Sequence, residues 1–282
     1  MSLSNLAIIG PGLLGGSIAM ASRAKNPATR ISIWARRDDA VEDVKKRGVA
    51  DVVSTDLRSV TEGAGMIVFC VPIGAMASLA GKIAPFVPGD ALVTDVGSVK
   101  APVVESLGKI FSKRARFIGS HPMAGSEQTG IEASRADLFE GAVCIVTPEE
   151  ATPPRDVEQA RQFWTMLGCK PRTLSPAEHD QVIALVSHLP HLLAATLVNL
   201  VCAENPDSLK FSGNGFRDST RVASGSPGMW AEIFGVNRAE VKKSVDAMIE
   251  KLREVSGFMD DEAKMRQFLS HAKSLRDELK KE

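Results

Sequence analysis

The sequence has no excess of either charge, no closely spaced pair of cysteines and no tyrosine. Its 34 lysines and arginines are balanced by 34 aspartates and glutamates, so no long-range field would draw the protein to nucleic acid or to an acidic membrane surface. The four cysteines lie far apart, without the C-x-x-C spacing of zinc or dithiol sites. These absences favour a small-molecule partner, no metal and reduced cysteines. The cysteines are Cys70, Cys144, Cys169 and Cys202.

Long apolar runs are also missing. A membrane-spanning helix needs about 20 consecutive apolar residues, and the longest candidate, residues 182–202, is interrupted by polar residues and a proline. We therefore expect a buried helix here. The interrupting residues are His188, Pro190, His191 and Asn199. The N-terminus, where a strand is expected near Leu6, has neither a secretory nor a transit pattern. We expect a cytoplasmic protein that does not bind membranes.

The first half of the chain alternates short, β-branched apolar runs with amphipathic stretches. This pattern is typical of a parallel sheet covered by helices on both faces. It predicts an α/β fold with a Rossmann-type, doubly wound, mostly parallel sheet. The expected strands are residues 6–9, 30–34, 66–71, 91–94, 116–118, 142–146 and 169–174.

Beyond residue 174, helical periodicity replaces the strand signals. We expect residues 1–174 to form a dinucleotide-binding domain and residues 175–282 an all-helical substrate and dimerisation domain. The first helix, residues 176–203, is apolar nearly all round, which is typical of a helix covered by other helices or by a second subunit. It indicates a homodimer formed through the helical domain. The predicted N-caps of the two charged helices that follow are Asn237 and Asp260.

A glycine-rich loop, Gly10-Pro-Gly-Leu-Leu-Gly15, directly follows the first predicted strand and opens a helix, which is the context of a dinucleotide-binding G-x-G-x-x-G loop. Gly10 permits the tight turn, Gly12 lets the backbone approach a pyrophosphate, and Gly15 lets the helix pack closely on the strand. The phosphates would lie at the helix N-terminus, whose unpaired N–H groups favour anions. The alternative is a turn that binds nothing. The other predicted cofactor-binding residues nearby are Leu13, Leu14, Val71 and Pro72.

The end of the second strand predicts which dinucleotide is bound. An Asp or Glu there would bind the 2′-hydroxyl of NAD, but the chain has Ala35, and Arg36 and Arg37 follow it. Because arginine pairs well with phosphate, this segment favours NADP over NAD. In the alternative interpretation, both arginines are solvated and Asp38 or Asp39 binds the ribose.

Two further loops follow strands of the expected sheet, at the edge where doubly wound folds bind ligands. The first, residues 94–100, offers the Ser98 hydroxyl to a substrate, although Ser98 could equally be the N-cap of the next helix. The second, residues 119–127, presents His121 directly after a buried strand. Because imidazole titrates near neutral pH, His121 is the predicted catalytic base for a substrate hydroxyl.

The helical half adds polar residues to an apolar background. His188 and His191 share one helix face. We expect both to be hydrogen-bonded, because the alternative, a metal site, lacks accompanying Cys or carboxylate ligands. Pro190 predicts a kink of the kind that borders ligand cavities. In the glycine-rich segment 213–221, Arg221 is the candidate for binding a substrate carboxylate through two hydrogen bonds.

Together these segments resemble the prephenate and arogenate dehydrogenases, the cyclohexadienyl dehydrogenase family of tyrosine biosynthesis. The similarity covers nearly the whole chain and implies a Rossmann-type domain followed by a helical dimerisation domain. It is carried by residues 10–16, 95–100, 120–127, 179–180, 187–191, 216–221 and 229–230.

The resemblance implies an NAD(P)-dependent oxidative decarboxylation. Hydride would leave the ring carbon that bears the 4-hydroxyl, carbon dioxide would depart, and the ring would become aromatic. By match to the family, His121 would take the hydroxyl proton, Ser98 would position both groups, and Arg221 would bind a substrate carboxylate. The residues lining the substrate pocket would be Glu127, His188, His191 and Trp230. No regulatory domain is expected before Glu282, so inhibition by tyrosine would act at the active site.

Two other interpretations use the same glycine loop. An imine or β-hydroxyacid reductase would share the architecture but would place a catalytic Lys or Asp in the second domain. A non-catalytic nucleotide-sensing regulator would leave Ser98, His121 and Arg221 unexplained. Between prephenate and arogenate the sequence leaves the choice open, because Glu127 suits the arogenate amine but belongs to the motif that both enzymes share.

Overall fold

The computed structural model describes residues 3–112, 114–126 and 128–279. Its N-terminal part is built on a six-stranded parallel sheet with the order β3-β2-β1-β4-β5-β6. This is the strand order of a Rossmann-type dinucleotide-binding fold, and it confirms the predicted fold class. The strands are β1 (Asn5–Ile9), β2 (Arg30–Trp34), β3 (Val52–Ser54), β4 (Met66–Phe69), β5 (Leu92–Asp95) and β6 (Arg116–Phe117).

Successive residues of the central strands point into two apolar clusters, one on each face of the sheet. In β1, Leu6 and Ile8 belong to the cluster that includes α1 and α6, whereas Ala7 and Ile9 belong to the cluster that includes α4 and α5. Both faces are therefore covered, which parallel sheets require. The helices of this part are α1 (Leu13–Lys25), α2 (Asp38–Arg47), α3 (Leu57–Thr61), α4 (Ile73–Ile83), α5 (Ala101–Phe111) and α6 (Pro154–Met166), with a 3-10 turn at Ile131–Ala133.

A second, three-stranded sheet departs from the sequence prediction. Its strands are β7 (Gly119–Pro122), β8 (Val143–Thr147) and β9 (Lys170–Thr173), with β7 antiparallel and β9 parallel to β8. His121 was expected in a loop, but it lies within β7, opposite Ile145. The reason is that the chain leaves the first sheet after Ile118, whose amide donates to the Val93 carbonyl, and immediately pairs with β8.

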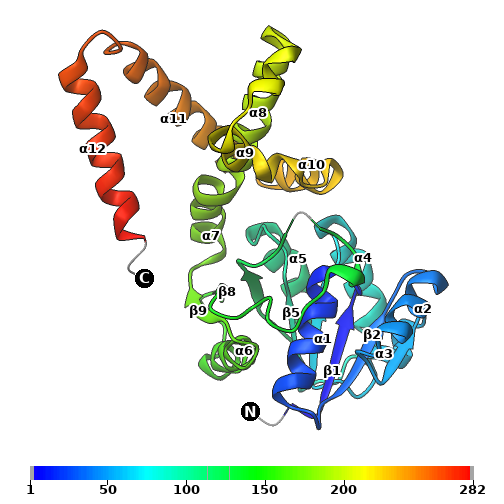
Figure 1. The fold of residues 1–282 in the computed structure, drawn as a ribbon. Helices are drawn as coiled ribbons and strands as arrows, with labels where there is room; N and C mark the ends of the chain where they lie inside the picture. The colour runs from blue at the N-terminus through cyan, green and yellow to red at the C-terminus, as the bar shows by residue number, and fades with distance from the viewer. Residues whose placement is uncertain (1–2, 113, 127, 280–282) are drawn as a thin grey trace.

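The C-terminal part is helical, as predicted. In Figure 1 a long helical column, formed by α7, the π-helical turn and α8, rises from the α/β part. Helix α10 lies back over the α/β part, and α11 and α12 form an arm on the other side. The elements are α7 (Pro176–Ile183), a π-helical turn (Ala184–His188), α8 (Leu189–Glu204), a 3-10 helix (Pro206–Phe211), α9 (Asn214–Thr220), a 3-10 turn (Arg221–Ser224), α10 (Pro227–Val236), α11 (Arg238–Ser256) and α12 (Glu262–Glu278).

The predicted proline kink takes the form of this π-helical turn. Pro190, which has no N–H to donate, is in the first turn of α8, directly after the turn Ala184–His188. A π turn within an α-helix is rare and often marks a functional site. Here it carries His188, which is completely buried.

The apolar helical stretch that the sequence predicted to be covered by other helices or by a second subunit is only partly covered within a single chain. The continuous helical stretch Pro176–Glu204 is long and apolar enough to cross a membrane by length and composition alone, yet only 33% of its most apolar part is buried. Several helical elements pack on α8, among them α9 and α11, but within a single chain they leave much of the Pro176–Glu204 stretch exposed. Its large exposed side chains include Leu185, Val186 and Leu200.

Of the two predicted helix N-caps, Asn237 is at the predicted position and Asp260 is one residue too early. Asp261, not Asp260, caps α12, and its carboxylate accepts from the Lys264 amide at 3.0 Å. Asn237 directly precedes α11 but makes no side-chain cap bond. Its side chain is instead turned into the buried interior of the helical part, where it has other partners.

Candidate active site

The glycine loop forms the tight turn that the sequence predicted. Gly10 has a φ of 110°, a left-handed conformation that favours glycine. A Cβ there would lie 2.5 Å from the Cys70 carbonyl oxygen, and a Cβ at Gly15 would overlap the Gly10 carbonyl oxygen. The loop therefore sits tightly between the ends of β1 and β4, where the strand order reverses.

The start of α1 suits a bound pyrophosphate. Space is open around Gly12, where a Cβ would meet no atom within 4 Å. Helix α1 begins at Leu13, with Leu14 next, and has no side-chain cap and no acidic residue in its first turn. Its first backbone N–H groups can therefore receive an anion. The residues present fit the phosphates of a dinucleotide.

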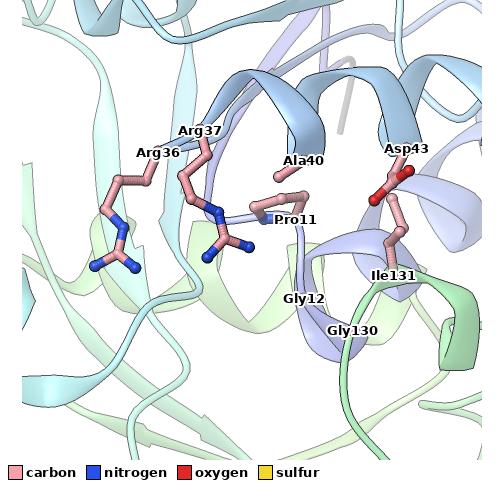
Figure 2. A pocket seen from close by; sticks show the side chains of 8 residues that line it. All are labelled: Pro11, Gly12, Arg36, Arg37, Ala40, Asp43, Gly130 and Ile131. Carbon is pink, nitrogen blue, oxygen red and sulfur yellow. The ribbon is translucent and has the colours of Figure 1, made fainter.

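A cavity of about 310 Å³ continues from this loop toward the end of β2. Figure 2 shows Arg36 and Arg37 at one end of it and Asp43 and Ile131 at the other. Arg37 pairs with Asp39 at 3.0 Å on the surface. Within the described part of the chain, Arg36 forms no ion pair. The lining residues are Pro11, Gly12, Arg36, Arg37, Ala40, Asp43, Gly130 and Ile131.

The end of β4 brings the two halves of the protein together. Val71 approaches the glycine loop, with its Cγ1 2.8 Å from the position of a Cβ at Gly10. Pro72 precedes α4, and the Gly74 amide in the first turn of α4 donates to Glu232 of α10. A helical-domain carboxylate therefore lies at the positive end of a helix that borders the predicted cofactor site.

A buried ion pair closes the loop that carries Ser98. Asp95 ends β5, Lys100 precedes α5, and both side chains are completely buried and bonded to each other. The Lys100 ammonium also donates to the Ser120 carbonyl at 2.8 Å, next to His121 in β7. Burial lowers the pKa of Lys100, and Asp95 opposes that shift. Ser98 is therefore held between two fixed residues, and it is not the N-cap of α5, which begins at Ala101.

The Asp180 carboxylate, from α7, holds the same loop from the helical side. It accepts from the backbone amides of Lys100 at 2.7 Å and Ala101 at 2.9 Å. The Asn237 side chain donates to the Asp180 carbonyl at 2.9 Å. The N-terminus of α5 is thus capped by a side chain from the helical part of the protein, in place of the local cap that the sequence suggested.

His121 is buried and has a histidine partner. Its Nδ1 lies 2.9 Å from Nε2 of His179, and Nδ1 of His179 lies 2.8 Å from Oδ1 of Asp180. Burial lowers the pKa of His121 well below its usual value, and His179, Lys100 and His188 lower it further. A histidine in this state is neutral at neutral pH and can accept a proton.

His188, at the end of the π-helical turn, and His191, in the first turn of α8, both have ring contacts with Trp230. Burial lowers the pKa of His188 to about 4, and its Nδ1 lies 3.2 Å from the Asn237 amide nitrogen. Within the described residues its Nε2 has no hydrogen-bond partner. His191 stacks on Trp230 of α10, with ring centroids 3.6 Å apart and an angle of 14° between the planes. These groups form a mixed aromatic and polar wall.

The two remaining predicted substrate-binding residues are Arg221 and Glu127. Arg221 is exposed at the start of a 3-10 turn that packs on α8. Gly225, at the end of the same turn, comes so close to Trp230 and His191 that a Cβ there would lie 3.2 Å from Cε1 of His191. Glu127 lies outside the described residues.

Sequence reasoning missed the residues that connect the site. Lys100 and the pair His179-Asp180 were noticed only as parts of motifs, and Asn237 only as a helix cap. A lysine five positions after an aspartate at the end of a buried strand was the one local sign of the ion pair. Nothing local indicated that the side chain of Asn237 turns inward.

Comparisons with known proteins match both halves of the chain. The family model for the prephenate dehydrogenase nucleotide-binding domain matches residues 18–172, and that for the dimerization domain matches residues 175–274. The cyclohexadienyl dehydrogenase of Zymomonas mobilis is 32% identical over 255 residues, which is 89% of this chain and 87% of the relative. The chain belongs to the prephenate dehydrogenase family.

Solved structures of the family have the same fold. The prephenate dehydrogenase of Aquifex aeolicus, in complex with hydroxyphenyl propionate and NAD+, superposes with a TM-score of 0.92 at 31% identity, covering 99% of each chain. The Synechocystis arogenate dehydrogenase gives 0.83 at 28% identity, covering 98% of this chain and 99% of that one. A 3-hydroxyisobutyrate dehydrogenase and a pyrroline-5-carboxylate reductase, at 12% and 14% identity, share the fold alone.

Proposed function

We propose that this member of the prephenate dehydrogenase family oxidises and decarboxylates prephenate, arogenate or both, with NAD(P) as hydride acceptor. The observation that carries the proposal is the neutral, buried His121 at the junction of the two halves. It lies beside the Ser98 loop and near the edge of the sheet where the glycine loop can hold a dinucleotide. The alternatives, an imine or β-hydroxyacid reductase and a non-catalytic regulator, have no comparable support.

The dinucleotide, when bound, supplies the acceptor for the hydride from the ring carbon that bears the 4-hydroxyl. His121 takes the proton of that hydroxyl and returns it to the oxygen when the phenol forms. As the hydride leaves, the hydroxyl becomes strongly acidic, so an unprotonated base matters more than a strong one. The lowered pKa of His121 meets this requirement. Ser98, on its fixed loop, orients the hydroxyl.

The substrate would lie between His121 and the helical wall. His188, His191 and Trp230 would line the substrate pocket. Arg221 would pair with a substrate carboxylate, because a dianionic substrate needs a cation to hold it. Glu127 belongs to the same proposed set. Tyrosine, if it inhibits, would compete for this pocket.

For the cofactor, we propose a preference for NADP. Arg36 and Arg37 lie at the end of β2 where an acidic residue would otherwise bind the ribose, and Ala35 is there instead. Asp38 and Asp39 remain the alternative ribose ligands. Arg36 is the better phosphate ligand of the two arginines, because Asp39 already engages Arg37.

We also propose that the chain divides near residue 174 and that its helical part forms a homodimer. The exposed apolar side chains of the π-helical turn, of α8 and of the α11–α12 arm support this, since large apolar surfaces are rarely left in water. Their covering by a second copy agrees with the dimerization domain matched at residues 175–274. The exposed residues include Leu185, Val186, Leu200, Leu252, Phe268 and Leu269.

The activity is tested by mixing the purified protein with prephenate or arogenate and with NAD or NADP, and following absorbance of the reduced dinucleotide. We expect turnover with at least one substrate, together with release of one carbon dioxide per hydride transferred. Absence of a signal in all four mixtures would refute the proposed function.

The proposed roles of His121 and Arg221 separate in steady-state kinetics. His121→Asn should lower kcat by about 100-fold or more, because it removes the base. Arg221→Ala should mainly raise KM for the substrate, because it removes a ground-state contact. The opposite pattern would mean that the two roles have been exchanged.

The cofactor preference depends on Arg36. Replacing it by alanine should weaken binding of NADP about tenfold or more, the loss of a charge-assisted bond, and leave NAD nearly unchanged. Dinucleotide binding is measured by fluorescence titration. The matched control is Arg30→Ala, at the opposite end of β2, which should alter neither. Equal losses for both dinucleotides in Arg36→Ala would leave Arg36 without this role.

The dimer is tested by sedimentation velocity. The wild type should sediment as two copies, and the double variant Leu185→Glu, Val186→Glu should shift toward one copy, because charges would be buried without partners. Lys82→Glu, an exposed change on α4, serves as a control and should sediment as the wild type does. A single-copy wild type would contradict the proposal.

A further inference from the structure

Three buried side chains from two parts of the protein form a hydrogen-bonded series, of which the proposed mechanism uses only His121. It runs from Nδ1 of His121 to Nε2 of His179 (2.9 Å), and from Nδ1 of His179 to Oδ1 of Asp180 (2.8 Å). His179 is completely buried, and His121 and Asp180 are 6% and 5% exposed. Two buried imidazoles in direct contact must share their protons in a definite order.

The positions of the protons follow from Asp180, the last member of this hydrogen-bonded series. An ionised carboxylate can only accept hydrogen bonds, so His179 carries its proton on Nδ1 and donates it to Asp180. In its neutral form His179 then has a bare Nε2, which can only accept. His121 must therefore donate from Nδ1, and its own Nε2 is left without a proton.

We propose that His179 and Asp180 are positioning residues for the reaction: they hold the proton of His121 on Nδ1 and leave its Nε2 bare to receive the substrate's hydroxyl proton. This inference rests on the proposed function, in which His121 is the base. No proton has to pass from His121 to His179 or Asp180. The hydroxyl proton moves to Nε2 of His121, and the same nitrogen returns it when the phenol forms.

The Asp180 carboxylate is fixed independently of the histidines. The backbone amides of Lys100 and Ala101 donate to it, and Asn237 holds its backbone carbonyl. It cannot rotate away without leaving buried N–H groups unpaired, which is unfavourable. The backbone amides at the N-terminus of α5, next to the Ser98 loop, thus set the orientation of all three hydrogen-bonded side chains.

The charges around His121 favour the same arrangement. The Lys100 ammonium, from the Ser98 loop, and the imidazoles of His179 and His188, from the helical column, all disfavour a proton on His121 in the resting state. Asp95 lies beyond Lys100 and is bonded to it, and Cys144 of β8 lies nearby with its pKa raised by burial. When His121 does take a proton, its Nδ1–H bond to His179, which Asp180 polarises, stabilises the new charge.

A pair of variants at His179 tests the inference. His179→Leu removes the acceptor for Nδ1 of His121, and kcat should fall by about 100-fold or more, with KM for the substrate and the dissociation constant for the dinucleotide changed less than about twofold. His179→Gln places an amide oxygen where Nε2 of His179 was, and it should restore most of the lost kcat. Asp180→Asn should resemble His179→Leu, because an amide group can donate to His179 and reverse the order of protons.

A direct readout needs no variant and no turnover. The chain has only five histidines, so 15N-imidazole labelling can report the protonated nitrogen of each by NMR. At neutral pH the wild type should show His121 with a proton on Nδ1 only, and His179→Leu should lose this uniform tautomer. His271→Gln, an exposed change in the middle of α12, is the control that should leave the His121 signal and kcat unchanged.

The outcomes separate this inference from the proposed function. A wild type that turns over its substrate but carries the His121 proton on Nε2 would overturn the inference alone. So would His179→Leu with wild-type kcat, or equal losses of kcat, dinucleotide binding and thermal stability in both His179 variants, since those indicate a purely structural role. A wild type with the Nδ1 tautomer but no turnover would overturn the proposed function instead.

Discussion

The geometry of the site depends on the Asp180 carboxylate. This side chain belongs to α7 in the helical part of the protein. It accepts hydrogen bonds from two backbone amides at the start of α5 and from the ring of His179. One side chain therefore fixes the Ser98 loop, the orientation of His121 and the junction between the two halves. Because all these groups are buried, losing any one bond leaves another group without a partner.

Burial shifts the pKa values of Lys100 and His121. The Asp95–Lys100 pair is completely buried, and a buried ion pair is weak support for stability because both charges lose hydration. Its contribution is positional and electrostatic: it closes the Ser98 loop and keeps a cation near His121, which helps to keep that imidazole unprotonated.

The sequence was most informative where the signal was local. The glycine loop, the parallel strands and His121 after an apolar run follow from short-range patterns, and the structure has them. It was least informative where partners are distant. His179 is 58 positions from His121, and Asn237 is 57 from Asp180, separations that no local periodicity reveals. Strands close to β8 and β9 were predicted, but their separation into a second sheet with β7 was missed because it depends on which distant strands pair. The three-residue β3 was missed because so short a strand has little pattern. For the apolar helix, composition predicted a cover of other helices or of a second subunit but does not say which.

Hydrogen exchange at the amides of Lys100 and Ala101 tests most directly whether Asp180 fixes the active-site loop. In the wild type both amides should exchange only through large-scale unfolding, as slowly as amides of the central strand β1. In Asp180→Asn they should exchange much faster, while β1 keeps its protection. Fast exchange of these two amides in the wild type, or unchanged protection in Asp180→Asn, would contradict the account.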